Sequence, residues 1–306
     1  MEPFADRLEA AVRRCGNPVL VGLDPRFGQL PSALTSAADP NNLDDVAAAY
    51  CTFCKGVIDV VASLVAVVKP QAAFFEQVGP AGMHALGEVI AYARERGLLV
   101  ILDGKRNDIG STAAAYADAY LGVESPWAAD ALTVSPYLGD DSLAPFVEIA
   151  DERGAGIFVL VKTSNPGGGL FQDLVCGQHT VYQIVGRHIE SLAASTQAAC
   201  GYGAVGAVVG ATYPEQLSEL RSVMPHAWIL VPGFGAQGAT AKAVAGAFDA
   251  RGLGAVVNSS RGIIFAHTKS EYRERFGESR WQEAVDAATR DMIDQLRSET
   301  SAGQLG

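Results

Sequence analysis

Short apolar runs rich in β-branched residues recur along this chain of 306 residues. A run of this kind, bounded by turn residues, is typical of a strand that is buried on both faces. Eight runs qualify, at residues 19–21, 65–68, 98–102, 131–134, 157–161, 205–209, 228–231 and 255–257. Alanine-rich segments with helical spacing lie between them, at 43–62, 81–96, 182–199, 214–223 and 239–248.

The alternation of eight strands with helices predicts an α/β fold, a (β/α)8 TIM barrel. A doubly wound open sheet is the alternative that the same alternation allows. No linker or composition break divides the sequence, so we expect a single barrel domain over residues 1–306. Two segments exceed a minimal barrel: an extended loop at about 26–42 and an extra amphipathic C-terminal helix at about 279–298.

The composition predicts a globular protein, because 49% of the residues are hydrophobic and only 19% are charged. The formal net charge is −11, which disfavours nucleic acids and anionic membranes as main partners. The first residues do not follow the signal-peptide pattern, and no apolar stretch approaches the roughly 18 residues of a membrane helix. We therefore expect no nucleic-acid partner and no membrane partner, whereas a small anionic substrate is compatible with the sequence.

The cysteines indicate a reducing compartment, because an odd number of five in a chain of this length favours free thiols in the cytoplasm. Cys51 and Cys54 have CxxC spacing, but no second pair lies at zinc-site distance, so we interpret them as core residues of a helix. None of the five histidines follows a predicted strand. The sequence therefore offers no histidine base, no Ser/His/Asp triad and no histidine-containing metal site.

Charged residues follow two neighbouring predicted strands, at the end where parallel α/β folds place their chemistry. Asp103 and Lys105 come directly after the third run, and strand alternation aims both side chains the same way. With Lys69 and Asp108 they would form a nearly neutral cluster in which each ammonium stays protonated. Protonated lysines suit proton donation rather than Schiff-base formation. The alternative is a buried ion-pair network that only fixes strand geometry.

A second pattern follows the last two predicted strands. Gly233, Gly235 and Gly238 would let the backbone approach a ligand closely, and Arg261 can bind a phosphate with paired N–H donors. Barrels often bind phosphate at the loops after strands seven and eight, although glycine-rich turns are also common without a ligand. Together with the charged cluster, this pattern indicates a phosphorylated ligand that is held at one end and reacts at the other.

The string Asp-Gly-Lys-Arg-Asn-Asp at 103–108, with Thr112 four residues later, resembles the D-x-K-x-x-D…T signature of the orotidine 5′-phosphate decarboxylase family. Four further motifs of that family are similar and occur in order: Val-Gly-Leu-Asp24-Pro, Val-Lys69-Pro, Val-Pro-Gly233-Phe-Gly-Ala-Gln237-Gly and Ser-Ser-Arg261-Gly. The segments 69–76 and 162–167 resemble the longer bacterial branch. Five separated matches are far more specific than the first string alone.

The resemblance implies an enzyme that converts orotidine 5′-phosphate to uridine 5′-phosphate (UMP) and carbon dioxide, without a metal or cofactor. It implies a homodimer of barrels with shared active sites. Lys105 would protonate C6 of the pyrimidine, Asp103 would lie beside the departing carboxylate, and Lys69 would bind ribose and hold Asp103. Asp108 and Thr112 would reach into the partner's site.

The resemblance also implies a substrate-binding set. Asp24 would bind a ribose hydroxyl, and Gln237 and Arg261 would bind the phosphate beside Gly233 and Gly262. Ser135 is expected to contact the pyrimidine edge, where longer-branch members often have asparagine. The stretch at 234–240 is short for the family's phosphate-gripping lid, so we expect the loop at 167–169 to share in closure.

Two alternatives stay open at this point. Metal-dependent sugar-phosphate decarboxylases and synthases of the same superfamily share D-x-K-x-x-D, but they place an acidic metal ligand where this chain has Lys69. An ammonium group there opposes a divalent cation. A non-catalytic phosphate-binding barrel is the other alternative, and the intact charged cluster argues against it.

Overall fold

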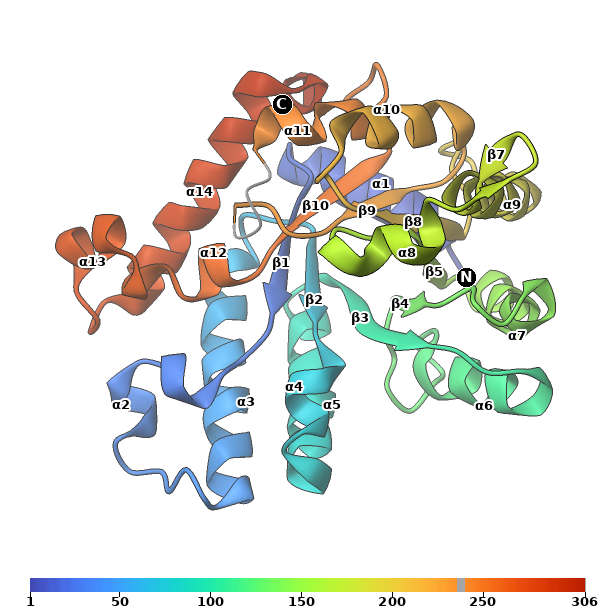
Figure 1. Ribbon diagram of the computed structural model, residues 1–306. Coiled ribbons are helices and arrows are strands. Elements are labelled where there is room, and N and C mark those ends of the chain that lie inside the picture. The colour runs from blue at the N-terminus through green and yellow to red at the C-terminus, as the bar shows by residue number, and fades with distance from the viewer. Residues whose placement is uncertain (236–239, 306) are drawn as a thin grey trace.

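The computed structural model describes residues 1–235 and 240–305. Within them, parallel strands close into a barrel in the order β1-β10-β9-β8-β5-β4-β3-β2 (Figure 1). The strands are β1 (Val19–Leu23), β2 (Val67–Pro70), β3 (Leu99–Arg106), β4 (Ala131–Val134), β5 (Gly156–Lys162), β8 (Val205–Val209), β9 (Ile229–Val231) and β10 (Ala255–Ser259). Each overlaps a predicted run, and β2 and β3 extend beyond their runs to include Lys69, Asp103 and Lys105. The closed order confirms the (β/α)8 barrel and excludes the open sheet.

Helices surround the barrel and connect successive strands (Figure 1). They are α1 (Phe4–Cys15), α2 (Ser32–Thr35), α3 (Leu43–Val61), α4 (Ala72–Glu76), α5 (Gly79–Glu95), α6 (Gly110–Tyr120), α7 (Asp140–Glu152), α8 (Gly169–Gln172), α9 (Val181–Ser195), α10 (Pro214–Val223), α11 (Ala241–Val244), α12 (Arg261–Ile264), α13 (Ser270–Phe276) and α14 (Trp281–Glu299). Local chemistry sets several boundaries. For example, the side chain of Asn42 caps α3 by accepting a hydrogen bond from the Asp44 N–H.

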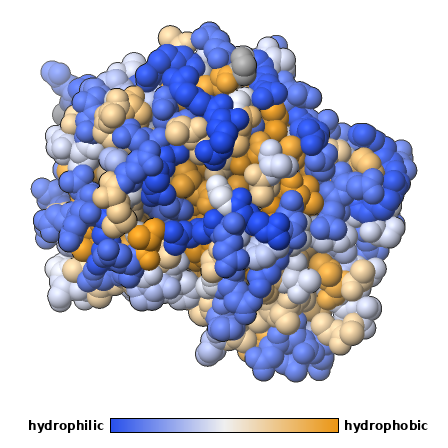
Figure 2. Space-filling view, turned by 180° about the vertical axis from the view of Figure 1, so that it is seen from behind, coloured by the Kyte–Doolittle hydropathy of each residue, from blue (hydrophilic) through white to orange (hydrophobic). Residues whose placement is uncertain are grey.

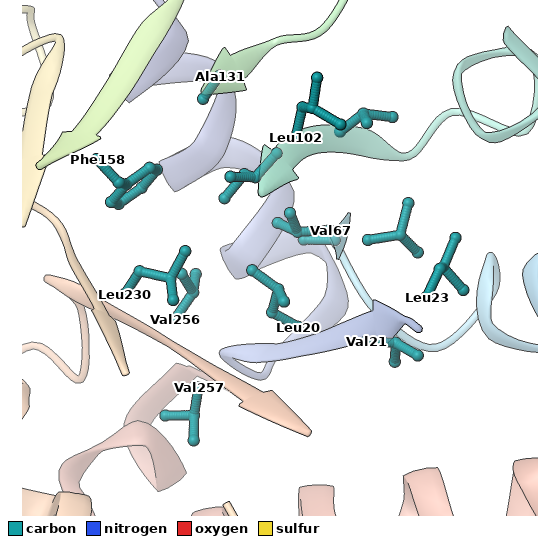
Figure 3. Packing of buried hydrophobic residues seen from close by; sticks show 14 of the residues in the cluster. Leu20, Val21, Leu23, Val67, Leu102, Ala131, Phe158, Leu230, Val256 and Val257 are labelled. Carbon is teal, nitrogen blue, oxygen red and sulfur yellow. The ribbon is translucent and has the colours of Figure 1, made fainter. Parts of the chain in front are cut away.

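The barrel interior is filled by apolar side chains from alternate strand positions. Figure 3 shows Leu20, Val67, Phe158, Leu230 and Val256 pointing toward one another inside the ring of strands. All five are at most 2% exposed. This packing makes the barrel a solid core rather than a pore, so a ligand can bind only at its ends.

Helix α1, which the sequence analysis did not predict, covers the amino end of the barrel. Phe4 packs edge-on against Phe158, with ring centroids 6.1 Å apart, and Arg7 pairs with buried Asp130 directly before β4. Gly156 leaves room for this contact, since a Cβ there would lie 2.3 Å from the Phe4 ring. The carboxyl end of the strands is therefore the open end.

Two additions flank the barrel. The segment after β1 contains a 3-10 turn (Phe27–Gln29) and α2, and the Ser32 N–H donates to Glu278 Oε1 at 2.7 Å. Helix α14 packs against α3 through Trp281 and Phe53, whose ring centroids are 5.2 Å apart. The sequence analysis also missed a short antiparallel hairpin of β6 (Val175–Cys176) and β7 (His179–Thr180).

The outer surface is mostly hydrophilic. Figure 2 shows the back of the molecule, where hydrophobic residues gather in the middle of the face and hydrophilic residues surround them. Among the described residues, no helix combines the length and the apolar character that crossing a membrane requires.

Candidate active site

Two lysines bind one buried carboxylate at the open end of the barrel. Asp103 on β3 accepts a hydrogen bond from Lys69 Nζ at 2.6 Å through Oδ2 and from Lys105 Nζ at 2.5 Å through Oδ1. Lys69 and Asp103 are only 4% and 7% exposed, whereas the Lys105 side chain is 48% exposed. Lys105 is therefore the ammonium of this cluster that a ligand can reach.

The backbone at Lys105 departs from regular strand geometry. Its φ is +44°, which side-chain-bearing residues rarely adopt, and the pairing of β3 with β4 shifts between Leu102 and Arg106. Thr133 on β4 supports this conformation, because its Oγ1 accepts from the Lys105 N–H and donates to Asp103 Oδ1, both at 2.9 Å. Such backbone strain clusters at functional sites, where the surrounding structure maintains it. The sequence analysis did not single out Thr133.

The opposite charges of Asp103 and Lys69 shift each other's pKa toward the charged form. Burial by itself raises the pKa of the Asp103 carboxyl, but the ammonium groups of Lys69 and Lys105 outweigh burial and hold that pKa well below its usual value. Burial also lowers the pKa of Lys69, yet the charges of Asp103 and Asp24 more than compensate and raise it. Both buried groups are thus charged at neutral pH.

A cavity of about 260 Å³ opens beside this cluster. The charged and hydroxyl groups of Asp103, Lys105 and Thr133 form one side of it. Residues 163–165, directly after β5, line it as well, and its apolar lining comes from Leu160, Val208, Leu230 and Pro232. A polar wall above an apolar base suits a flat ring that carries a few polar groups. A larger hollow of about 620 Å³ lies between α3 and α5 on the outside of the barrel, away from the strand ends.

Two buried acceptors lack partners in the described part of the chain. Asp24 follows β1, and its Oδ1 accepts no hydrogen bond there. Asn258 on β10 is 6% exposed; its Nδ2 donates to Ser260 Oγ at 3.3 Å, while its Oδ1 has no donor among described residues. A Cβ at Gly22 would lie 2.9 Å from that oxygen, so the glycine gives Asn258 its space. Buried acceptors of this kind suit ligand hydroxyls. The sequence places Asn258 at the end of the eighth predicted run, but the sequence analysis assigned it no role.

The loop after β9 is tied to the end of β10. Gly233 and Gly235 have φ of +86° and +75°, conformations that favour glycine. The Phe234 N–H donates to the Asn258 carbonyl at 3.0 Å, and Ser259 Oγ donates to the Phe234 carbonyl at 3.2 Å. These bonds bring the Gly233 loop beside the segment that carries the expected phosphate ligands.

Of those ligands, Arg261 is exposed and forms no ion pair within the part of the chain that the structure describes. Gly262 is tightly packed, since a Cβ there would lie 2.6 Å from Ser259 Oγ. Gln237 lies outside the described residues.

Three predicted site residues stand apart from the charged cluster. Asp108 is partly exposed, its Oδ1 accepts from the Ile109 N–H at 2.8 Å, and it forms no ion pair within the described ranges. Thr112 is exposed in the first turn of α6. Ser135 is partly exposed after β4 and is not among the residues that line the cavity. Within one chain, the structure thus groups Asp24, Lys69, Asp103 and Lys105.

Metal-binding capacity can be judged from the donor groups. Across residues 1–235 and 240–305, no three histidine, cysteine, aspartate or glutamate residues are grouped so that they could hold a metal ion. Asp103, the acid that lines the cavity, is already paired with Lys69 and Lys105.

Comparison with known proteins identifies the family. The sequence model described as the orotidine 5′-phosphate decarboxylase / HUMPS family matches residues 32–276. An orotidine 5′-phosphate decarboxylase of Rhodopirellula baltica is 62% identical over 301 residues, covering 97% of this chain and 100% of the relative. That of Caldicellulosiruptor bescii is 35% identical over 93% of this chain and 98% of its own length. The solved Leishmania donovani OMP decarboxylase is 34% identical, with a TM-score of 0.75 over 97% of this chain and 98% of that one. The chain therefore belongs to the orotidine 5′-phosphate decarboxylase / HUMPS family.

Proposed function

We propose that this protein decarboxylates orotidine 5′-phosphate to UMP and carbon dioxide, the last step of de novo UMP biosynthesis. The observation that carries the proposal is the pair of lysines on the buried Asp103 carboxylate, with Lys105 facing the cavity. The 62% identity to an enzyme of that name supports the same reaction.

The reaction breaks the bond between C6 and the carboxyl group and leaves the electron pair on C6. No cofactor is proposed as an electron sink, so the developing charge must be stabilised by the protein. The Lys105 ammonium meets that requirement, because it is charged, reachable from the cavity and held by Asp103 and by its supported backbone. Lys105 then donates a proton to C6, which completes the product.

Asp103 has a second effect. A carboxylate held beside the substrate's own carboxylate repels it, and the repulsion ends when carbon dioxide departs. The low pKa of Asp103 keeps that negative charge in place at neutral pH. Lys69 balances the charge from the buried side, so the site is preorganised before the substrate binds.

The remaining groups would bind the rest of the nucleotide. Asp24 Oδ1, which has no donor among the described residues, suits a ribose hydroxyl, with Lys69 beside it. Arg261 would bind the phosphate next to Gly233, Gly262 and the undescribed Gln237. Binding energy from this remote phosphate can be used to hold the reacting ring against Lys105.

We further propose a homodimer with shared active sites. Exposed apolar side chains follow β3, β4 and β5, which are adjacent strands, so they lie on one side of the open end. We call this set the apolar rim: Ile109, Tyr137, Leu138, Leu170 and Phe171. The Tyr137 and Phe171 rings are 6.5 Å apart, which links two of the loops. A patch of this kind favours a subunit interface.

Asp108 and Thr112 flank Ile109 of the apolar rim. Neither contacts the charged cluster of its own chain, and Asp108 has no ion-pair partner in the described residues. In a dimer built on the rim, both side chains would reach the partner's cavity, as the family resemblance implies.

We also propose a cytoplasmic location, which the free state of all five thiols supports.

The test is the change in ultraviolet absorbance when purified protein is mixed with orotidine 5′-phosphate. We expect complete conversion to UMP, and no spectral change would overturn the proposed activity. A parallel reaction with a metal chelator addresses the sugar-phosphate alternative. Unchanged turnover is expected, since Lys69 occupies the place of an acidic metal ligand; loss of activity that magnesium restores would favour the alternative.

A further inference from the structure

Lys162 is a buried cation that the proposed reaction does not use. It is the last residue of β5 and is only 2% exposed. Its ammonium pairs with Asp173, and it lies 5.3 Å and 5.7 Å from the ring centroids of Tyr182 and Tyr213. Two aromatic faces and one carboxylate therefore hold a charge outside the barrel, between β5 and the segments that follow it.

The ion pair closes the loop that follows β5. Thr163, which follows Lys162, is bonded in the same way to Gln172, which precedes Asp173. The Thr163 N–H donates to Gln172 Oε1 at 3.0 Å, and Gln172 Nε2 donates to Thr163 Oγ1 at 2.8 Å. Two neighbouring side-chain contacts therefore join the two ends of one loop, Lys162 with Asp173 and Thr163 with Gln172. The loop has a further tie on the side of β8, because Thr212 Oγ1 donates to the Ser164 carbonyl at 3.3 Å.

The first residues of this loop form one wall of the cavity. Residues 163–165 line it together with Asp103, Lys105 and Thr133. The wall is also held from β8, because the Gly210 N–H donates to the Lys162 carbonyl at 2.8 Å. The opposite side of the loop exposes Leu170 and Phe171 of the apolar rim.

We propose that Lys162 is a positioning residue whose ion pair with Asp173 holds the wall at 163–165 against the substrate. This inference rests on the function proposed above. The physical reason concerns specificity of conformation rather than stability. A buried ion pair contributes little net stability compared with apolar residues of similar size, but it permits only one arrangement of its two partners. A wall that moves away from the substrate loses contacts that are made in the ground state and the transition state alike, which raises KM more than it lowers kcat.

The experiment compares Lys162→Met with the wild-type protein and with Lys162→Arg. Methionine keeps much of the side-chain volume and loses the charge, whereas arginine can still pair with Asp173. We expect the KM for orotidine 5′-phosphate to rise about tenfold in Lys162→Met, with a smaller change in kcat, and to recover in Lys162→Arg. The matched control is Arg7→Met, which breaks the Arg7–Asp130 pair at the closed end of the barrel. It should lower thermal stability and leave KM unchanged.

Hydrogen–deuterium exchange of residues 163–173 provides a readout that does not need turnover. Exchange in this loop should accelerate in Lys162→Met and stay at the wild-type rate in Arg7→Met. If folded Lys162→Met has the wild-type KM, the inference is wrong, whatever the exchange rate. If the wild-type protein itself does not turn over orotidine 5′-phosphate, the proposed function fails instead, and unchanged loop exchange would then overturn the inference separately.

Discussion

Lys69 and Lys105 bind opposite oxygens of one carboxylate, at 2.6 Å and 2.5 Å, although they come from different strands. The shared anion fixes the distance between the two ammonium groups, and its charge helps to raise the pKa of Lys69. Only Lys105 is open to the cavity. Lys69 is therefore the buried partner of Asp103, and Lys105 is the partner that a ligand can contact.

The first prediction concerns Lys105. We expect Lys105→Ala to lower kcat by at least about a thousandfold, because the charge developing on C6 loses its stabilising ammonium and its proton donor. UMP should still bind, since the proposed ribose and phosphate contacts are intact. Stopped-flow absorbance and calorimetry measure the two quantities. Lys242→Ala, on the exposed side of α11, is the control and should behave as wild type. Near-normal turnover in Lys105→Ala would remove Lys105 from its proposed role.

Asp103→Asn should be strongly destabilising as well as inactive. The substitution leaves Lys69, which is 4% exposed, without its ion-pair partner. Removing one member of a buried pair costs about 3–5 kcal/mol of unfolding free energy. Urea denaturation gives this quantity directly. Asp108→Asn provides the comparison, because Asp108 has no ion pair within the described residues and its loss should change stability little. Equal stability of the two variants would contradict the assigned burial of the cluster.

Thr133 should prove necessary for the geometry of Lys105. Thr133→Val keeps the side-chain shape but removes the acceptor for the Lys105 N–H and a donor to Asp103. Because one of these bonds involves a charged group, we expect a loss of about 1–3 kcal/mol in unfolding free energy and about a tenfold lower kcat. Thr133→Ser retains the hydroxyl and should recover most of the kcat. A valine variant with wild-type kcat would show that the strained conformation at Lys105 needs no such support.

The shared-site proposal predicts complementation between inactive protomers. Lys105→Ala and Asp108→Ala proteins should each be inactive alone. After unfolding and refolding together, random pairing would restore both groups in about a quarter of the sites. Activity near that fraction supports a site that uses Asp108 of the partner. If mixed dimers form, as native mass spectrometry would show, and no activity returns, Asp108 acts within its own chain or not at all.

The pKa directions predict how the cluster responds to pH. The pKa of Asp103 is lowered, so its contribution to stability is present above the ordinary value of about 3.9 and is lost as pH falls toward the folded-state pKa. The pKa of Lys69 is raised, so its contribution is present below about 10.4 and is lost as pH rises through the folded-state pKa. The stability difference between wild type and Asp103→Asn should therefore shrink as pH falls below about 4. A difference that stays constant or grows as pH falls below about 4 would contradict the direction for Asp103.

Much of the fold could be predicted because it depends on local patterns. Each apolar run corresponds to a strand, since burial on both faces leaves a continuous apolar signature in the sequence. Helices α1 and α7 were not predicted, although both carry amphipathic patterns; α7 contains Pro145, which interrupts a helical reading. The hairpin of β6 and β7 has two residues per strand, too few for any periodicity.

The chemical cluster was also predictable, because strand ends in a parallel barrel converge and Asp103, Lys105 and Lys69 stand at such ends. Strand alternation alone, however, does not explain why Asp103 and Lys105 point the same way. Regular alternation was expected to align Asp103 with Lys105, whereas β3 is irregular there and Lys105 has a positive φ. The alignment depends on a hydrogen bond from another strand.

The order of residues alone thus determined which strands exist, how they alternate with helices and which charged groups arrive at the open end. The tertiary structure decided which atoms meet: Thr133 beneath Lys105, Asp173 on Lys162, and Asn258 in the space left by Gly22. The physical reason is that periodicity records the burial of each residue, whereas a hydrogen bond depends on the register and separation of segments far apart in the chain. Those quantities follow from packing the whole barrel, and no local stretch of sequence contains them.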